Sequence, residues 1–216
     1  MSIELDPAVD PALLPAMIAP ATTALLVIDV QVDFVAPSGA VGRSGVDLTK
    51  MAAPLERIET LMRVARNAGV TVVLTRVVTR PETDTNAQKL FRQRKGHPPS
   101  SSDICRAGTD GVGYYRITPV AGDIEIEKPN YSSFVGTDLA DRLRQRGIDT
   151  LVLCGFTTEC CIDCTARDAF HLDFNVFVVM DACAAYSDDL HLGALNALSN
   201  NCALLTDTNG VSTAWT

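Results

Sequence analysis

The sequence predicts a three-layer α/β/α fold, in which a central, mostly parallel six-stranded sheet is covered by helices on both faces. Short runs rich in Val, Ile and Leu alternate with amphipathic stretches along the 216 residues. The runs are apolar without clean alternation, which suits strands buried on both faces of a parallel sheet. Regular alternation of strand and helix patterns with short connections is typical of α/β folds. The predicted strands are Thr23–Asp29, Thr71–Val77, Asp123–Glu127, Thr150–Cys154, Asn175–Met180 and Cys202–Thr206.

Four amphipathic stretches are predicted to be helices. In the first, Leu55, Ile58 and Leu61 recur at helical spacing, and the pattern ends before Gly69, a residue type that often ends a helix. A chain of this length fits one domain, so we expect a single domain over residues 1–216, with residues 1–20 as an N-terminal extension. The helical patterns cover Asp47–Asn67, Thr137–Arg146, Glu159–Leu172 and Leu190–Asn200.

Residues 81–115 break this alternation. The segment is long, irregular and polar, and it holds the basic run FRQRKGH. Loops of this length in compact domains are usually lids or binding loops. A surface excursion without a catalytic role fits the same length, so both interpretations stay open at this point.

Composition and charge exclude several classes of function. Apolar residues make up 47% of the chain and charged residues 20%, which argues against a disordered or collagen-like protein. The net charge of −8 argues against binding to nucleic acid or to an anionic membrane, because both need a basic face. No run reaches the roughly 20 apolar residues of a membrane span. The N-terminus lacks the basic region of a secretory signal, so we expect a cytoplasmic protein.

The seven cysteines favour reduced thiols. Their number is odd, and four of them crowd into residues 154–164. A disulfide framework in a secreted domain would spread its cysteines along the chain. The cysteines are Cys105, Cys154, Cys160, Cys161, Cys164, Cys183 and Cys202.

Three polar residues stand near the ends of predicted strands, where parallel α/β sheets bind ligands. Asp29 closes an apolar run, and a carboxylate there is costly to bury without a partner. Cys161 is expected in the first turn of a helix, where the helix dipole would stabilise a thiolate and lower the thiol pKa. Lys128 follows the third strand. Taken singly, each has an ordinary structural explanation, namely a salt bridge, a buried thiol and a solvated amine.

Two other kinds of site share the cysteine cluster. Cys161 and Cys164 form a C-x-x-C motif, which elsewhere marks redox dithiols or zinc sites. A structural zinc site usually needs four ligands, and the isolated His97, His171 and His191 supply no second pair. The sequence has no G-x-S-x-G, P-loop or G-x-G-x-x-G motif. A redox dithiol therefore stays open as an alternative to hydrolysis.

The motifs VIDVQVDF, EKPNYSSF and GFTTECCIDCTARDA, in this order, resemble those of the isochorismatase-like cysteine hydrolases. This family includes nicotinamidases, N-carbamoylsarcosine amidases, ureidoacrylate amidohydrolases and biuret hydrolases. The resemblance covers residues 23–206. It implies the Rossmann-type form of the fold predicted above, assembled as a homodimer or homotetramer.

The resemblance also implies catalytic roles. Asp29, Lys128 and Cys161 match the family's catalytic aspartate, lysine and nucleophile, and the pattern G-x-x-T-x-x-C selects Cys161 over Cys160. The reaction implied is acyl transfer through a thioester. The N–H groups of Thr157 and Cys161 would form the oxyanion hole, next to a cis bond that the family has at Phe156–Thr157.

Departures from the family pattern narrow the expected activity. Nicotinamidases carry an Asp-x-His…His metal set after the second strand, whereas this chain reads LTRVVTRPETD, so we expect no metal and no other cofactor. Isochorismatases proper usually lack the nucleophilic cysteine, so Cys161 argues against the alternative of vinyl-ether hydrolysis.

The expected substrate is a small amide or ureide, with a carbamoyl or ureido group favoured and a carboxylate as an option. The stretch from FRQRKG to EKPNYSSF is most similar to the ureide-cleaving members. Arg76 either binds the carboxylate of such a substrate or forms a structural ion pair, and both interpretations stay open at this point. The other expected substrate contacts are Phe34, Tyr131, Phe134 and Thr158.

Overall fold

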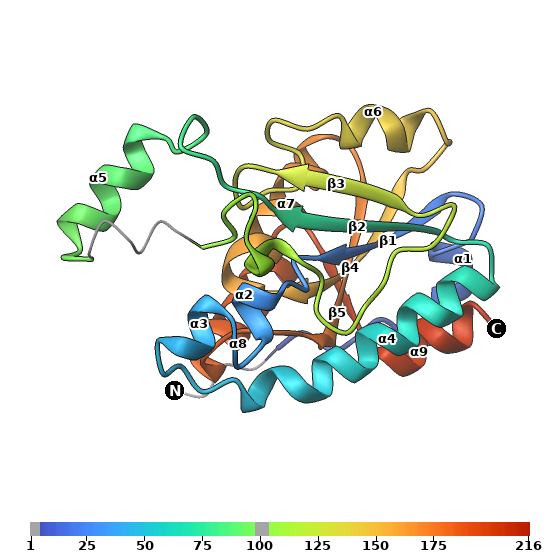
Figure 1. The fold of residues 1–216 in the computed structure, drawn as a ribbon. Coiled ribbons are helices and arrows are strands. Elements are labelled where there is room, and N and C mark those ends of the chain that lie inside the picture. Colours follow the sequence, from blue (N-terminus) through green and yellow to red (C-terminus); the bar gives the residue numbers. More distant parts are fainter. Residues whose placement is uncertain (1–4, 98–103) are drawn as a thin grey trace.

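The computed structural model describes residues 5–97 and 104–216, and its centre is a six-stranded sheet (Figure 1). The strand order is β3-β2-β1-β4-β5-β6, and every pairing between neighbouring strands is parallel. The α/β prediction is confirmed, with a sheet that is parallel throughout. The strands are β1 (Thr23–Ile28), β2 (Thr71–Val77), β3 (Ile124–Lys128), β4 (Thr150–Phe156), β5 (Asn175–Ala184) and β6 (Leu204–Thr206).

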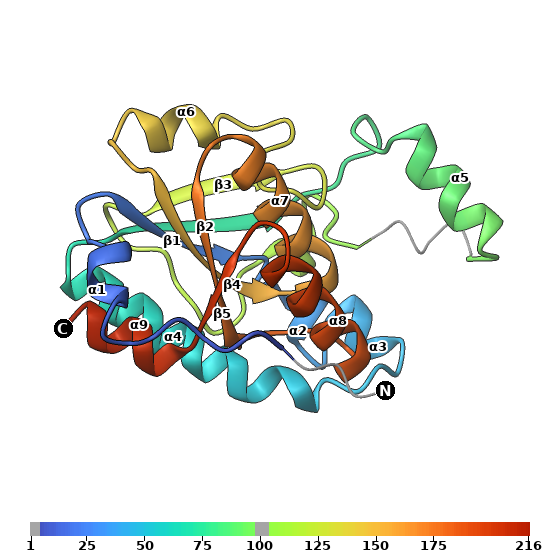
Figure 2. The same ribbon diagram turned by 180° about the vertical axis from the view of Figure 1, so that it is seen from behind.

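Helices cover both faces of the sheet, as Figures 1 and 2 show. One apolar cluster joins Leu25 and Val27 of β1 to helices α1, α4 and α9, and a second joins Leu26 and Ile28 to α6, α7 and α8. Alternate side chains of a strand point to opposite faces, so both faces need apolar residues. No helix among residues 5–97 and 104–216 is long and apolar enough to cross a bilayer. These helices are α1 (Leu14–Met17), α4 (Ala52–Asn67), α6 (Leu139–Arg144), α7 (Asp163–His171), α8 (Asp188–Ser199) and α9 (Thr208–Ala214).

The remaining elements lie near the carboxyl ends of the strands. Residues 81–115, expected to be irregular, contain the helix α5, which projects from the body on that side (Figure 1). A capping box starts this helix, because the Thr85 side chain accepts from the Gln88 N–H and Gln88 accepts from the Thr85 N–H. The elements are α2 (Val32–Val35), α3 (Ala40–Arg43), α5 (Asn86–Arg94), the 3₁₀ turns η1 (Thr49–Met51) and η3 (Asp110–Val112), and the π-helical turn η4 (Thr158–Ile162).

The described part of the N-terminal extension, residues 5–20, packs against the body of the domain. Leu14 and Ile18 are fully buried in the α4–α9 cluster. The Trp215 indole donates to the Ile18 carbonyl at 2.9 Å, and the Val9 N–H donates to the Leu205 carbonyl at 2.8 Å. The N-terminal segment thus closes one edge of the sheet.

The strand order reverses between β1 and β4, which makes this pair the topological switch point of the sheet. Gly155 pairs with Ile28 across it and has a φ of +126°. A Cβ atom at position 155 would lie 2.0 Å from the Ile28 carbonyl oxygen, so a side chain does not fit there. Glycine therefore lets β4 approach β1 just before both strands end.

Candidate active site

Asp29 is the first residue after β1, and its φ of +54° lies in the left-handed region. Its Oδ2 lies 2.7 Å from the Lys128 Nζ, and both side chains are completely buried. Its Oδ1 accepts a hydrogen bond from the Thr75 hydroxyl at 3.3 Å, and the Cys161 thiol also hydrogen-bonds with this carboxylate. The contacts bring together the three residues that were predicted to be catalytic.

Lys128 ends β3, which is separated from β1 by β2, so its long side chain spans the intervening strand. Besides the Asp29 carboxylate, its ammonium group donates to the carbonyl oxygens of Asn130, at 3.0 Å, and Tyr131. The loop after β3 therefore folds back around its own lysine. A buried ammonium needs such partners, because an unpaired charge in the interior is costly.

Cys161 lies across the switch point from Asp29, in the turn η4 that follows β4. This turn is π-helical and precedes α7, whereas the sequence predicted a regular α-helix from Glu159. The N–H groups of Cys160 and Ile162 both donate to the Thr157 carbonyl at 3.2 Å. The peptide bond between Phe156 and Thr157 is cis.

The three buried groups shift one another's pKa. Burial raises the pKa of the Asp29 carboxyl, although Lys128 opposes the shift. Burial by itself lowers the pKa of Lys128, but the charges of Asp29 and Cys161 raise it above its usual value. The hydrogen bond with Cys160, burial and the Asp29 charge together raise the pKa of the Cys161 thiol. The expected lowering of this thiol pKa is therefore wrong, because burial and the neighbouring groups favour the protonated form of the thiol.

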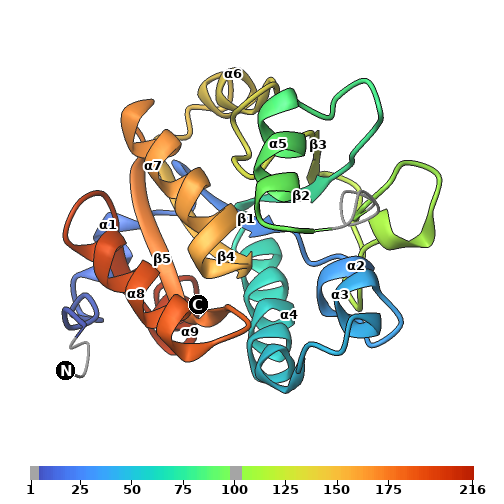
Figure 3. The same ribbon diagram turned by 90° about the vertical axis from the view of Figure 1, so that its left-hand side faces the viewer.

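Cys161 opens onto a cavity of about 270 Å³ at the carboxyl end of the sheet. Figure 3 views this end of the molecule, with α5 in front of β2 and β3. The segment 81–115 lines part of the cavity through Gln88, Arg92 and Ile104, which favours its interpretation as a binding loop. The other lining residues are Phe34, Val41, Val77, Thr79, Pro129, Asn130, Tyr131, Phe156, Thr157, Glu159, Cys160 and Tyr186.

The predicted substrate contacts divide into two groups. Phe34 and Tyr131 line the cavity, whereas Arg76, Phe134 and Thr158 do not. The Arg76 guanidinium instead binds the carboxylate of Glu127 at 3.0 Å.

The other two predicted contacts that do not line the cavity, Phe134 and Thr158, contact neighbouring loops and helices. The Phe134 ring stacks on the Phe174 ring with centroids 5.8 Å apart. The hydroxyl of Thr158 is buried and lies 2.8 Å from the His191 Nδ1. These three residues support the structure around the site without facing the cavity.

Two buried polar residues that the sequence did not point to hold the chain around the candidate site. The Gln31 side chain is fully buried, accepts from the Val77 N–H at 2.7 Å and donates to the Val77 carbonyl at 2.9 Å, which ties the chain after β1 to the end of β2. The Ser133 N–H donates to the Thr165 hydroxyl at 3.0 Å, which fastens the loop after Lys128 to α7. In the sequence, Gln31 and Ser133 show only that a polar residue follows a predicted strand, which is a weak local signal.

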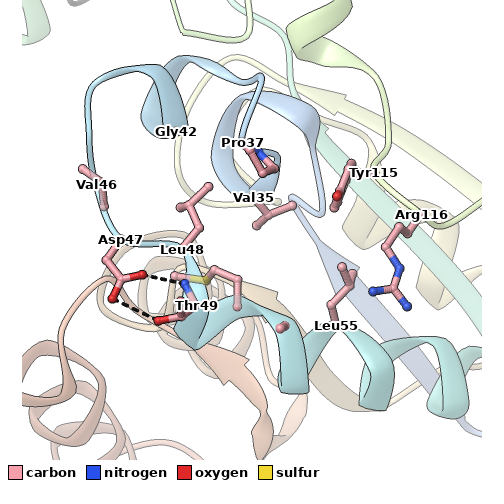
Figure 4. Close-up of a pocket in the computed structure, with 12 residues that line it drawn as sticks. Val35, Pro37, Gly42, Val46, Asp47, Leu48, Thr49, Leu55, Tyr115 and Arg116 are labelled. Atoms are coloured by element: carbon pink, nitrogen blue, oxygen red, sulfur yellow. Dashed lines mark hydrogen bonds between the residues drawn. The ribbon is translucent and has the colours of Figure 1, made fainter.

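Larger hollows elsewhere contain none of these groups. One of about 450 Å³ lies between the α2–α3 segment and α4, where Asp47 hydrogen-bonds with Thr49 and apolar side chains form most of the wall (Figure 4). Another of about 600 Å³ lies beside β6. Within residues 5–97 and 104–216, no three His, Cys, Asp or Glu side chains are grouped to hold a metal ion.

Known proteins share this fold and sequence. The isochorismatase domain family model matches residues 23–210. A Methylobacterium radiotolerans protein named ureidoacrylate amidohydrolase RutB is 33% identical over 195 residues, which cover 84% of this chain and 74% of that protein. The structure of a cysteine hydrolase from Pseudomonas syringae pv. phaseolicola has a TM-score of 0.79 at 28% identity, covering 100% of this chain and 98% of the other. For an N-carbamoylsarcosine amidase from Thermoplasma acidophilum, the TM-score is 0.68 at 26% identity, covering 87% and 97%. Since the family model spans most of the chain, this protein belongs to the isochorismatase family.

Proposed function

We propose that this protein is a cysteine amidohydrolase that cleaves a C–N bond in a small amide or ureide. The observation that carries the proposal is the buried Asp29 carboxylate, which contacts both the Lys128 ammonium and the Cys161 thiol at the cavity. A nucleophile, a base within hydrogen-bonding reach and a cation that orients the base are the parts that covalent acyl transfer needs.

The first half-reaction forms a thioester. The Asp29 carboxylate takes the thiol proton while the Cys161 sulfur bonds to the substrate carbonyl carbon, so no preformed thiolate is required. Lys128 keeps its proton and stabilises the negative charge at the site. The N–H groups of Thr157 and Cys161 are proposed to bind the oxyanion. When the C–N bond breaks, Asp29 returns the proton to the leaving nitrogen.

The second half-reaction releases the acid. A water molecule gives a proton to Asp29 and attacks the thioester carbonyl, the C–S bond breaks, and the sulfur regains its proton from Asp29. The raised pKa of Asp29 suits this exchange, because a stronger base removes a thiol or water proton more readily. The same carboxyl group thus serves as base and acid in turn.

The names of the relatives support a carbamoyl or ureido substrate. One is an ureidoacrylate amidohydrolase and another is an N-carbamoylsarcosine amidase, and both names describe such a group. We include no metal in the mechanism, because the segment after β2 has no histidine before His97. The homo-oligomer and the cytoplasmic location stay predictions.

Ammonia release from a panel of small amides and ureides tests the proposal. The panel holds N-carbamoyl amino acids, biuret, ureidoacrylate, maleamate and nicotinamide, and is run with wild type, Cys161→Ala and Cys164→Ser. We expect release from a ureide that vanishes in Cys161→Ala, survives in Cys164→Ser and is insensitive to chelator. Equal loss in Cys164→Ser would favour the redox dithiol. Hydrolysis of isochorismate in a separate assay, without ammonia release from any panel member, would favour vinyl-ether hydrolysis.

A further inference from the structure

We propose that the cavity recognises the two ends of a ureido acid by opposite charges. Arg92 binds the carboxylate, and Glu159 accepts the N–H groups of the terminal ureido nitrogen, with Cys161 between them. This inference rests on the proposed function and narrows its substrate class to short ureido acids.

Glu159 lines the cavity, and one of its carboxylate oxygens has no hydrogen-bond partner among the described residues. It lines the cavity two residues before Cys161, in the turn η4. Its Oε2 is buried and has no hydrogen-bond partner among the described residues. A buried carboxylate oxygen without a donor is costly, so its lack of a partner needs an explanation, and a bound ligand is one. An N–H group of the substrate supplies that donor.

Arg92 is brought to the same cavity by α5. Gln88 and Arg92 are four residues apart, which places both on one face of the helix, and both line the cavity. The Gln88 amide donates to the Asn130 side-chain oxygen, and this links α5 to the loop that surrounds Lys128. Among the described lining residues, Arg92 is the basic one and Glu159 the acidic one.

Each of these charges shifts the pKa of a different tyrosine in the cavity wall. Burial and the charge of Cys160 raise the pKa of Tyr131, while Arg92 opposes the shift and Cys161 adds to it. Burial and the charge of Glu159 raise the pKa of Tyr186, and Cys161 again adds to the shift. Arg92 therefore lies near Tyr131 and Glu159 near Tyr186, and Cys161 is within reach of both.

A ureido acid matches this arrangement. Its carbonyl carbon lies between a terminal NH₂ group, which only donates, and a chain that ends in a carboxylate, which only accepts. With the carbonyl at Cys161, the NH₂ group meets Glu159 and the carboxylate meets the planar guanidinium of Arg92, which binds carboxylates in a bidentate manner. A neutral monoamide would satisfy only one of the two charges.

Binding measurements in a Cys161→Ala background test the inference without turnover. The ligands are 3-ureidopropanoate, its carboxamide and its terminal N,N-dimethyl derivative, and the readout is the Kd from calorimetry. Each ligand change should weaken binding by about 10- to 100-fold, as expected for a hydrogen bond to a charged group. Adding Arg92→Met should abolish the preference for carboxylate over carboxamide and keep the preference for NH₂. Adding Glu159→Leu should do the reverse.

Controls separate recognition from folding. Arg94→Met lies on the same helix, and Glu56→Leu removes an exposed acid, so both should keep the two preferences. Because Glu159→Leu removes a buried acceptor without a partner, its Tm should not fall below that of the Cys161→Ala parent. A fall of several degrees would indicate a structural role for Glu159 and contradict the inference.

The outcomes also separate this inference from the proposed function. Preferences that survive both Arg92→Met and Glu159→Leu, or no binding of 3-ureidopropanoate at all, would overturn the inference. Cys161-dependent hydrolysis measured in parallel on wild type would then still support the amidohydrolase. Selective binding without any hydrolysis by wild type would support the two-charge cavity and reject the proposed reaction.

Discussion

The carboxyl ends of β1 and β4 and the helix α5 border the same cavity, but they are built in different ways. Asp29 and Cys161 are buried, and they are held by a sheet that is apolar on both faces. In α5 no residue is buried, and Phe91 is 59% exposed. The helix keeps its shape through its capping box and meets the site through Gln88.

This difference assigns two tasks to two kinds of structure. Reacting atoms must be held within fractions of an ångström, which packed strands achieve. Recognition of a distant substrate end tolerates more movement, and segments with few buried contacts open locally at low free-energy cost. We therefore expect changes at the sheet to alter kcat and global stability, and changes in α5 to alter KM.

The largest expected effect is on turnover. Asp29→Asn should lower kcat by about 10²- to 10⁴-fold, the range that a positioned general base contributes. The amide cannot take the thiol proton, and Lys128 loses its counter-charge. Steady-state kinetics on the ureide identified by the panel would measure the loss. A kcat within threefold of wild type would show that Asp29 is not the general base and that the reaction does not take place at the switch point.

The next effect is on global stability. Lys128→Met should lower the free energy of unfolding by about 3–5 kcal/mol, because it leaves the Asp29 carboxylate buried without its partner. Urea denaturation measures it, and Asp29→Leu/Lys128→Met should recover most of the loss. The matched α5 change, Lys89→Met at an exposed position, should stay within about 0.5 kcal/mol of wild type.

Two helix caps test whether α5 contributes to global stability as α8 does. Ser187 caps α8 by accepting from the Leu190 N–H at 3.3 Å, and Ser187→Ala should lower global stability by about 1 kcal/mol. Thr85→Ala removes the equivalent cap from α5 and should leave the global value unchanged within error, while raising KM and speeding amide exchange in α5. Equal losses of global stability in the two variants would mean that α5 folds cooperatively with the sheet.

The smallest expected effect depends on pH. Burial lowers the pKa of His191 below its usual 6.5, although Asp188 opposes the shift. His191 therefore binds a proton more readily in the unfolded chain than in the folded protein. Its contribution to the free energy of unfolding is fully present above about pH 6.5 and is lost as the pH falls below that value. His191→Gln should flatten this part of a Tm-against-pH curve. An unchanged slope would show that other groups cause the acid sensitivity.

The sequence predicted the proximity of Asp29, Lys128 and Cys161 better than it predicted the cavity wall, and strand geometry explains why. Asp29 and Cys161 follow apolar strands, and this pattern can be seen locally. Arg76 was predicted to contact the substrate, but its neighbour Val77 lines the cavity instead. In a strand, a shift of one residue moves the side chain to the opposite face of the sheet. Arg92 and Glu159 have no local signal, because their place depends on how α5 and η4 meet across the cavity. The reach of Lys128 across β2 likewise depends on the strand order.

The close contact at Gly155 has a consequence for engineering this scaffold. A mutant library gains nothing from diversity at position 155, since any side chain would push β4 away from β1 and separate Asp29 from Cys161. Positions 88, 92 and 159 border the cavity without touching that contact. Selection for new substrates can therefore proceed there while the spacing between Asp29 and Cys161 is inherited unchanged.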